Sequence, residues 1–350
     1  MRDREAMQEH KVEPSVVPAE TVLEGARPSW RRRYNLARVV EVNGLLLLMV
    51  LLIIFYTILL PETFPTQLTL RAILQASTTT AFLALGEAIV IAAGEFDLSV
   101  GYVVGLCAVL AVGLQDHSHI SWPLAALIVV LVGGAAGLVN GILVRFVKID
   151  SFIATLGLGT ICYGVANWYT GGRQIVGDLP HGYLALSQNV LGLPLPAFFV
   201  LVLAVVVWVC FEFLPIGRYL YATGSNRRAA ELVGIPIGRY TVGAFVATGL
   251  IVGIAGVVLG SQLQIGESNV GPEFLLPAFV GALLGATTVR PGRVNAWGTI
   301  IAVLILAVGI SGLEQLGGQF FVEPLFDGST LIVAVGLAGY AARRRLRARS

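Results

Sequence analysis

Apolar residues occur in long runs between residues 44 and 342, separated by short polar segments. A helix needs about 20 apolar residues to cross the hydrocarbon layer of a membrane, and fewer where its ends lie inside a bundle. By that measure the chain has ten candidate spans, at residues 44–60, 72–93, 98–114, 122–144, 152–170, 196–214, 240–261, 274–288, 295–312 and 329–342. Several are short or interrupted by glycine, which is typical of closely packed or broken membrane helices. The pattern predicts an all-α, polytopic transmembrane bundle.

Positive charges indicate how these spans are oriented, because Lys and Arg accumulate in short cytoplasmic loops. With ten spans and the N-terminus inside, all of the 23 Lys and Arg residues except Arg71 and Arg173 fall on the cytoplasmic side. We therefore expect an N-in, C-in topology. Residues 1–43 are then a largely disordered cytoplasmic tail, 44–342 the transmembrane domain, and 343–350 a basic cytoplasmic tail.

Composition excludes a soluble enzyme. Hydrophobic residues make up 56% of the 350 residues and charged residues 13%, about half the charged fraction of a soluble domain. A net charge of +2 is too balanced to indicate a nucleic-acid partner, so membrane lipid is the expected surrounding. The cysteines Cys107, Cys162 and Cys210 lie in apolar runs, where they act as small hydrophobic residues.

Motifs for catalysis and for cofactor binding are absent from the sequence. There is no G-x-x-x-x-G-K-[ST] phosphate loop, and Lys11 and Lys148 are the only lysines. The four histidines, His10, His117, His119 and His181, lack metal-binding spacing. We therefore expect no catalytic residue, metal or cofactor in this chain, and no ATP hydrolysis by it.

The segment Ala93–Gly101, AGEFDLSVG, lies between the second and third apolar runs. Ionisable residues at a break in a membrane helix are costly and are therefore functional candidates. Alternatively, Asp97 and Ser99 cap a helix that begins at Leu98. Glu87 lies inside an apolar helix, where a structural role explains it less well.

The loop at residues 215–238 is basic and lies on the expected cytoplasmic side. Gly224-Ser225-Asn226 supplies a turn and a helix N-cap, the run from Arg227 to Val233 predicts one or two helical turns, and Gly234 with Pro236 ends them. A short capped helix of this kind fits a groove on a soluble motor. It is also compatible with an ordinary amphipathic connector.

Together these segments resemble the permease subunits of ATP-binding-cassette importers of the ribose and simple-sugar type. Residues 94–101 are similar to that family's G-G-[IF]-D-L-S-V-G, and Asn140-Gly141 and Ser151–Gly157 resemble its N-G and P-F-I-x-T-L-G elements. The family's G-R-x-x-x-A-x-G-x-N-x-x-A-A-x-x-x-G-I is similar to the loop at Gly217, Arg218, Ala222, Gly224, Asn226, Ala229, Ala230, Gly234 and Ile235.

The resemblance covers residues 44–342 with some departures. Glu95 stands where many members have a second glycine, and Ser151 where many have proline. Residues 281–293 follow the family's pattern only loosely.

The resemblance implies a bacterial inner-membrane permease that works with partners. Two copies, or this chain and a close relative, would form a central pathway for a monosaccharide such as ribose, xylose or galactose. A substrate-binding protein would deliver the sugar to the acidic outer loops 171–194 and 262–273, which alternatively are simply solvated. ATPase subunits, using ATP and Mg²⁺, would clasp the 215–238 loop. The implied contact residues are Gly217, Arg218, Gly224, Asn226, Ala229, Ala230, Gly234 and Ile235.

Polar groups in apolar segments are candidates for the pathway itself: Asp97, Ser99, Asn140, Thr155 and Asn167. They would hydrogen-bond sugar hydroxyls, or instead join helices to one another. Three other functions remain open: an importer permease for branched-chain amino acids or nucleosides, an ion-coupled transporter using Glu87, Glu95 and Asp97, and a membrane scaffold that transports nothing.

Overall fold

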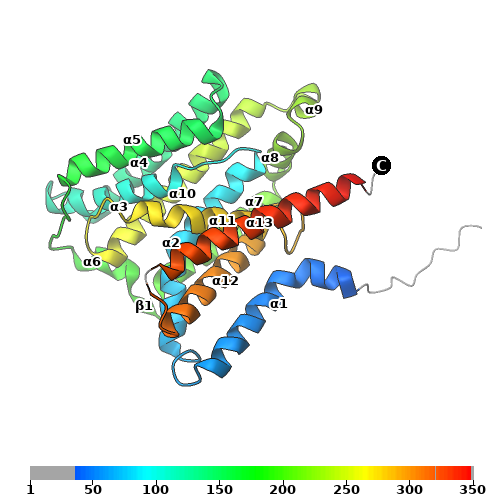
Figure 1. Cartoon of the computed structure of the whole chain (residues 1–350). Coiled ribbons are helices and arrows are strands. Elements are labelled where there is room, and N and C mark those ends of the chain that lie inside the picture. The colour runs from blue at the N-terminus through cyan, green and yellow to red at the C-terminus, as the bar shows by residue number, and fades with distance from the viewer. Residues whose placement is uncertain (1–35, 320, 348–350) are drawn as a thin grey trace, which may run out of the picture.

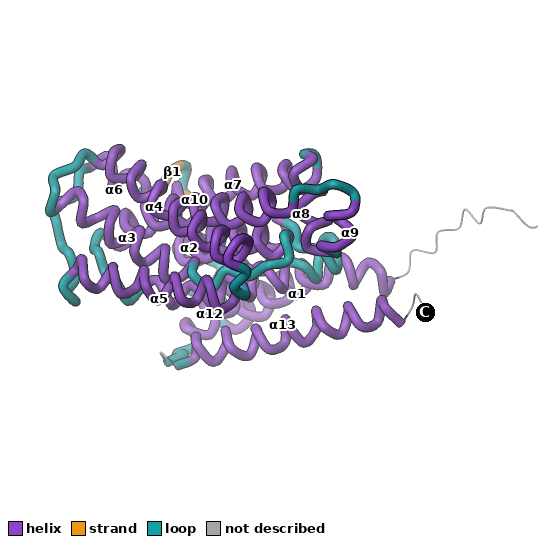
Figure 2. Tube along the Cα trace, turned by 90° about the horizontal axis from the view of Figure 1, so that it is seen from above, coloured by secondary structure: helices purple, strands orange, loops and turns teal. Residues whose placement is uncertain are grey.

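The computed structural model describes residues 36–319 and 321–347, which form a bundle of helices (Figures 1 and 2). In the first half of the chain the helices are α1 (Leu36–Leu59), α2 (Gln67–Ala92), α3 (Val100–Asp116), α4 (Trp122–Ile142) continued by the π-helix η2 (Leu143–Val147), α5 (Ser151–Thr170), α6 (His181–Leu184) and the 3-10 helix η3 (Ala185–Ser187). A hairpin of β1 (Asn189–Val190) and β2 (Leu193–Pro194) follows. The second half contains α7 (Leu195–Glu212), α8 (Pro215–Ser225), α9 (Arg227–Leu232), α10 (Ile237–Leu263), the 3-10 helix η4 (Gly271–Phe274), α11 (Leu275–Gly285), α12 (Ala296–Gln315) and α13 (Val322–Arg347).

The expected all-α bundle is confirmed, and each candidate span coincides with a helix. Five helical segments in the described residues are long and apolar enough to cross a membrane: α2, α4 with η2, α7, α10 and α12. Shorter apolar helices occur at Asn43–Leu59, Val100–Asp116 and Gly271–Gly285. The protein is therefore a multi-pass membrane protein, while ten spans and the N-in, C-in orientation remain predictions.

Helix ends differ from the expected ones at both termini. α1 begins at Leu36, inside the expected tail, because Leu36, Val39 and Val40 extend its apolar composition by two turns. α13 starts at Val322, before the apolar run that the sequence indicates at 329. Residues 1–35 and 348–350 of the two expected tails lie outside the described residues.

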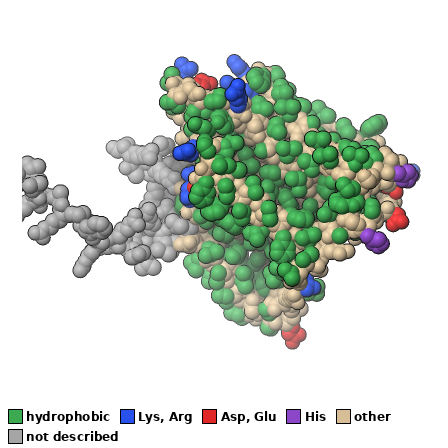
Figure 3. All heavy atoms as spheres, turned by 180° about the vertical axis from the view of Figure 1, so that it is seen from behind, with side chains coloured by type: hydrophobic (Ala, Val, Ile, Leu, Met, Phe, Trp, Pro, Cys, Tyr) green, Lys and Arg blue, Asp and Glu red, His purple; other side chains and the backbone are tan. Residues whose placement is uncertain are grey.

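The bundle has two chemically different ends. Figures 1 and 2 show the start of α1 and the end of α13 at the end where α8 and α9 lie, with α6 at the opposite end. On the face drawn in Figure 3, apolar side chains cover the middle, Lys and Arg gather mainly toward one end, and the histidines and several acidic residues lie at the other. This arrangement suits a protein whose middle is surrounded by lipid.

Helix α2 forms the centre of the fold. It packs against α7, α10, α11 and α12, and its residues from Ser77 to Ala88 are all buried. Its first turn is capped by Thr66, whose hydroxyl accepts a hydrogen bond from the Thr69 backbone N–H at 3.2 Å. By contrast, α4 and α7 expose apolar side chains such as Leu131 and Val202 on their outer faces, as expected for helices next to lipid.

Glycines allow α4 and α10 to approach until their backbones touch. A Cβ added to Gly137 would lie 2.1 Å from the Phe245 carbonyl oxygen, and one added to Gly249 would lie 2.2 Å from that of Gly133. Small residues four positions apart are a common basis for close helix contacts in membranes. The glycine spacing Gly133, Gly137 and Gly141 therefore determines how closely these two helices pack.

A single methyl group should disturb this contact. We expect Gly249→Ala to lower the stability of the solubilised protein by about 1–3 kcal/mol, because the helices must move apart. Gly243→Ala on the same helix is the control, since a Cβ there meets no atom within 4 Å. Thermal unfolding followed by size-exclusion chromatography measures both, and equal melting temperatures would contradict the prediction.

Candidate functional site at the break between α2 and α3

The segment between α2 and α3, residues 93–99, is called the break below. α2 ends in a Schellman motif, in which the Gly94 N–H donates to the Ile91 carbonyl at 2.9 Å and the Glu95 N–H to the Val90 carbonyl at 3.1 Å. Gly94 has φ of +81°, a conformation that suits glycine. The motif turns the chain sharply and satisfies two carbonyl groups that the end of the helix leaves open.

Four predicted pathway residues meet at the break, and we call them the break cluster: Asp97, Ser99, Asn140 and Thr155. Asp97 Oδ1 accepts hydrogen bonds from the Ser99 N–H at 3.0 Å and the Ser99 hydroxyl at 2.5 Å. The Asn140 amide donates to Ser99 Oγ at 2.8 Å and to Asp97 Oδ1 at 3.3 Å. All four residues are at most 2% exposed. The cluster thereby attaches the break to α4.

Thr155 attaches the break to α5. Its hydroxyl accepts the Leu98 backbone N–H at 2.9 Å and donates to the Ser151 carbonyl at 2.7 Å. The Ser151 hydroxyl in turn accepts the Phe96 N–H at 3.4 Å. These contacts satisfy backbone groups of the break that would otherwise be buried without a partner. They also show that α3 begins at Val100 and not at Leu98 as expected, with Asp97 binding the N–H of Ser99 just before it.

The fifth predicted pathway residue, Asn167, lies elsewhere. It is 12 positions after Thr155 on α5, a separation of about 18 Å along a helix. Its side-chain oxygen accepts the Ser268 hydroxyl at 3.0 Å, and its amide donates to the Tyr163 carbonyl at 3.0 Å. Asn167 therefore belongs to the opposite end of α5.

The three acids considered for an ion site are not brought together as one site. Glu87 is fully buried on α2 with Asp97 as its charged neighbour, and neither of its carboxylate oxygens has a hydrogen bond of good geometry within the described residues. Glu95 forms an ion pair with Arg227 instead. No group of three or more His, Cys, Asp or Glu residues suited to a metal ion occurs in the part of the chain that the structure describes.

The 215–238 loop contains the short helix that the sequence predicts. Asn226 caps α9, its side-chain oxygen accepting the Ala229 N–H at 3.0 Å. Gly234, with φ of +82°, ends the helix, and the Ile235 N–H donates to the Ala230 carbonyl at 3.0 Å. The preceding helix α8 was not predicted, because Gly217 and Gly224 weaken its helical pattern.

The eight predicted contact residues of this loop divide into two groups. Gly217 and Ala230 are buried, Ile235 is half-buried, and Gly224, although exposed, lies against the end of α2. Arg218, Asn226, Ala229 and Gly234 are exposed. Next to them, Leu232 and Val233 are 77% and 76% exposed at the tip of α9. This apolar tip with adjacent arginines is a surface suited to a protein partner.

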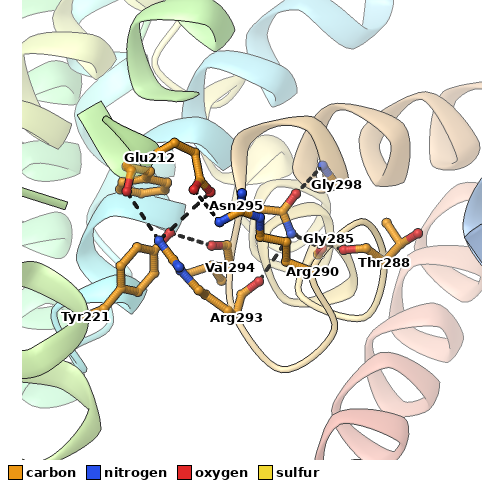
Figure 4. Close-up of polar contacts among 10 residues, drawn as sticks. Glu212, Tyr221, Gly285, Thr288, Arg290, Arg293, Val294, Asn295 and Gly298 are labelled. Atoms are coloured by element: carbon orange, nitrogen blue, oxygen red, sulfur yellow. Dashed lines mark hydrogen bonds and ion pairs between the residues drawn. The ribbon is translucent and has the colours of Figure 1, made fainter. Parts of the chain in front are cut away.

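A second polar network, which the sequence did not predict, attaches α8 to the loop between α11 and α12 (Figure 4). Glu212 at the end of α7 forms ion pairs with Arg290 and Arg293. The Arg293 guanidinium lies 3.6 Å from the centre of the Tyr221 ring, and the Tyr221 hydroxyl donates to the Val294 carbonyl at 2.8 Å. Burial raises the pKa of Tyr221 above its ordinary value.

Asn295 stabilises the other side of this network (Figure 4). Its amide donates to the carbonyls of Gly285 and Thr288, both at 3.1 Å, and its oxygen accepts the Gly298 N–H at 2.8 Å. In the sequence, only one acid at the end of an apolar run and two arginines 78 and 81 positions later indicated this network. Pairing across that separation cannot be read from spacing.

Comparisons with known proteins agree with this arrangement. The family described as the permease component of the branched-chain amino acid transport system matches residues 69–336. The chain belongs to this permease family. The ribose import permease protein RbsC of Bacillus subtilis (strain 168) is 32% identical over 307 residues, covering 87% of this chain and 95% of that protein. The autoinducer 2 import system permease protein LsrD of Escherichia coli (strain K12) is 32% identical over 259 residues, covering 72% and 78%. No solved structure matches the chain.

The two acidic loops that are expected to receive a partner lie side by side at the end of the permease opposite α8 and α9 (Figure 1). Ile175 and Gly266 pair through two backbone hydrogen bonds of 2.9 Å. The Gln174 amide donates to Glu267 at 3.0 Å, beside the contact between Asn167 and Ser268. Segments 171–194 and 262–273 therefore form one continuous surface, although they are far apart in sequence.

The permease also contains a half-open cavity of about 610 Å³ between α2, α10, η4, α11, α12 and α13, with both polar and apolar residues in its wall; it is called the polar cavity below after its polar residues. Thr79 and Thr80, which are 2% and 8% exposed, contribute to its wall. Its other polar lining residues are Gln75, Ser77, Gln262, Glu273, Ser311, Glu314 and Glu323. The Gln262 amide nitrogen is buried and has no hydrogen-bond partner among the described residues. The run Ser77–Thr80 inside an apolar helix was the sequence signal for this cavity, and it was missed.

Removing the hydroxyl of Thr155 should destabilise the break. Thr155→Val keeps the shape but leaves the buried Leu98 N–H without its acceptor, a cost of about 1–3 kcal/mol. Thr160→Val is the control, because Thr160 lies on the same helix, is exposed, and within the described residues bonds the Leu156 carbonyl alone. We expect a lower melting temperature for Thr155→Val alone. Equal loss in both variants would show that the contact to the break contributes nothing.

Proposed function

We propose that this permease is the transmembrane subunit of an ATP-driven importer in the bacterial inner membrane, and that it carries a monosaccharide delivered by a substrate-binding protein. The observation that carries the proposal is the match to the ribose import permease over 95% of that relative's length. The assembly would contain a second copy of the permease or a close homologue, together with two ATP-binding subunits. ATP and Mg²⁺ would be bound by those subunits, and this chain would need no cofactor of its own.

A monosaccharide is favoured over the other cargo classes. The matching family is described by branched-chain amino acid transport, but the named relatives are permeases for ribose and for autoinducer 2. No observation favours nucleosides. An ion-coupled mechanism using Glu87, Glu95 and Asp97 is disfavoured because Glu95 already forms an ion pair with Arg227.

The polar cavity is proposed as the outer part of the transport pathway. Its volume of about 610 Å³ lies within the range of small-molecule sites, about 300–1,000 Å³. Hydroxyl, amide and carboxylate groups on its wall match the hydrogen-bonding groups of a sugar. The substrate-binding protein would dock on the neighbouring surface of segments 171–194 and 262–273. That the break cluster and Asn167 line the pathway remains a prediction.

Blocking the cavity should stop uptake without disturbing assembly. Ala76→Trp adds a large ring at an exposed position in the cavity wall. We expect uptake of labelled sugar to fall to background, while the ATP-binding subunit still co-purifies. Ala135→Trp, on the exposed face of α4, is the control and should keep normal uptake. Normal uptake by Ala76→Trp would exclude the cavity from the pathway.

The proposed motor contact can be tested at the apolar tip of α9. Val233→Asp is preferable to a change at Gly234, because φ of +82° at Gly234 makes any side chain there strained. We expect Val233→Asp to remove the ATP-binding subunit from the purified complex, since a buried charge replaces an apolar contact. Leu191→Asp, at a 91% exposed position in the hairpin, should leave the ATP-binding subunit bound. An unchanged complex with Val233→Asp would contradict the assignment.

A further inference from the structure

The 215–238 loop touches the break directly. A Cβ added to Gly224 would lie 2.4 Å from the Ala92 carbonyl oxygen, and one added to Gly94 would lie 2.8 Å from the Gly224 Cα. The end of α8 and the end of α2 are therefore in backbone contact. Such a contact transmits force in one direction only, because two surfaces in van der Waals contact resist compression but separate easily.

An ion pair supplies the connection that resists separation. Arg227, the first residue of α9, forms an ion pair with Glu95, the residue after Gly94. The Glu95 side chain is 8% exposed and that of Arg227 is 49% exposed. Within the described residues, Arg227 is the one partner of the Glu95 carboxylate among the hydrogen bonds and ion pairs. Separating the two side chains would leave the nearly buried Glu95 carboxylate without a compensating charge, which costs free energy.

The position of Glu95 makes this connection short. Glu95 lies two residues before Asp97, whose carboxylate is joined to Asn140 on α4, and three before Leu98, which is bonded to Thr155 on α5. Residues 95–98 therefore join Arg227 on α9 to the hydrogen bonds with α4 and α5, and α3 begins two residues further on. The other ion pairs of α9, from Glu231 to Arg145 and Arg228, are longer, at 3.9 and 4.0 Å, and more exposed.

We propose that Glu95 and Arg227 form a positioning pair that couples the 215–238 loop to the break in both directions. When a motor subunit draws α9 away, the pair carries the break with it, and the break cluster transfers the movement to α4 and α5. When α9 returns, the contact between Gly94 and Gly224 pushes the break back. This inference rests on the proposed function, and it assigns neither residue to contact with the sugar.

The test measures coupling, not transport alone. The permease, its ATP-binding subunits and its binding protein are reconstituted in liposomes, and ATP hydrolysed per sugar imported is compared among variants. We expect Glu95→Gln and Arg227→Gln each to raise this ratio by about fivefold or more, with hydrolysis retained. Glu231→Gln is the matched control on the same helix and should keep the wild-type ratio.

Two further variants separate coupling from simple loss of structure. The exchange Glu95→Arg with Arg227→Glu should bring the ratio back toward the wild-type value. If the exchanged protein does not assemble, the double variant Glu95→Gln with Arg227→Gln decides: its ratio should equal that of either single variant, because both lose the same interaction.

The contradicting results are distinct. A wild-type ratio in Glu95→Gln, or additive effects in the double variant, would overturn the positioning pair while leaving the proposed function intact. Absence of ATP-dependent uptake by the wild-type assembly would overturn the proposed function, and this inference with it.

Discussion

A helix break inside an apolar bundle is the constraint on which the rest of this structure depends. Backbone N–H and C=O groups left without helical partners at the break are largely enclosed by neighbouring helices, so protein groups must satisfy them. The Schellman motif at Gly94, the Asp97 carboxylate and the Thr155 hydroxyl do this. Because Thr155 lies on α5, and Asn140 on α4 donates to the Asp97 carboxylate, these contacts also fix where both helices lie relative to α3.

Close backbone contacts connect the break to the 215–238 loop, which lies at the surface of the bundle. Gly224 brings α8 against the end of α2, and glycines on α4 and α10 let these helices touch along their length. The network of Glu212, Arg293 and Tyr221 then holds α8 against the loop before α12. The position of α9, which follows α8 directly, is therefore fixed by these contacts, and its apolar tip is exposed.

Much of the fold followed from the sequence because apolar runs and caps are local signals. Each candidate span coincides with a helix, and Asn226 and Gly234 mark the limits of α9 as expected. Contacts between distant segments were not predictable: the partner of Glu95 is 132 positions away. For the same reason, the sequence indicated the four residues of the break cluster one by one, but not that they lie together. The cavity wall at Thr79 was missed because hydroxyl groups in a helix also bond their own backbone.

The central claim is that ATP drives a sugar through this permease. The most direct measurement is uptake of a labelled monosaccharide into liposomes containing the complete assembly, with ATP supplied on the side of α9 and the binding protein on the opposite side. The account predicts uptake that requires ATP and persists after proton and sodium gradients are collapsed. Uptake that follows either gradient in the absence of ATP would contradict it.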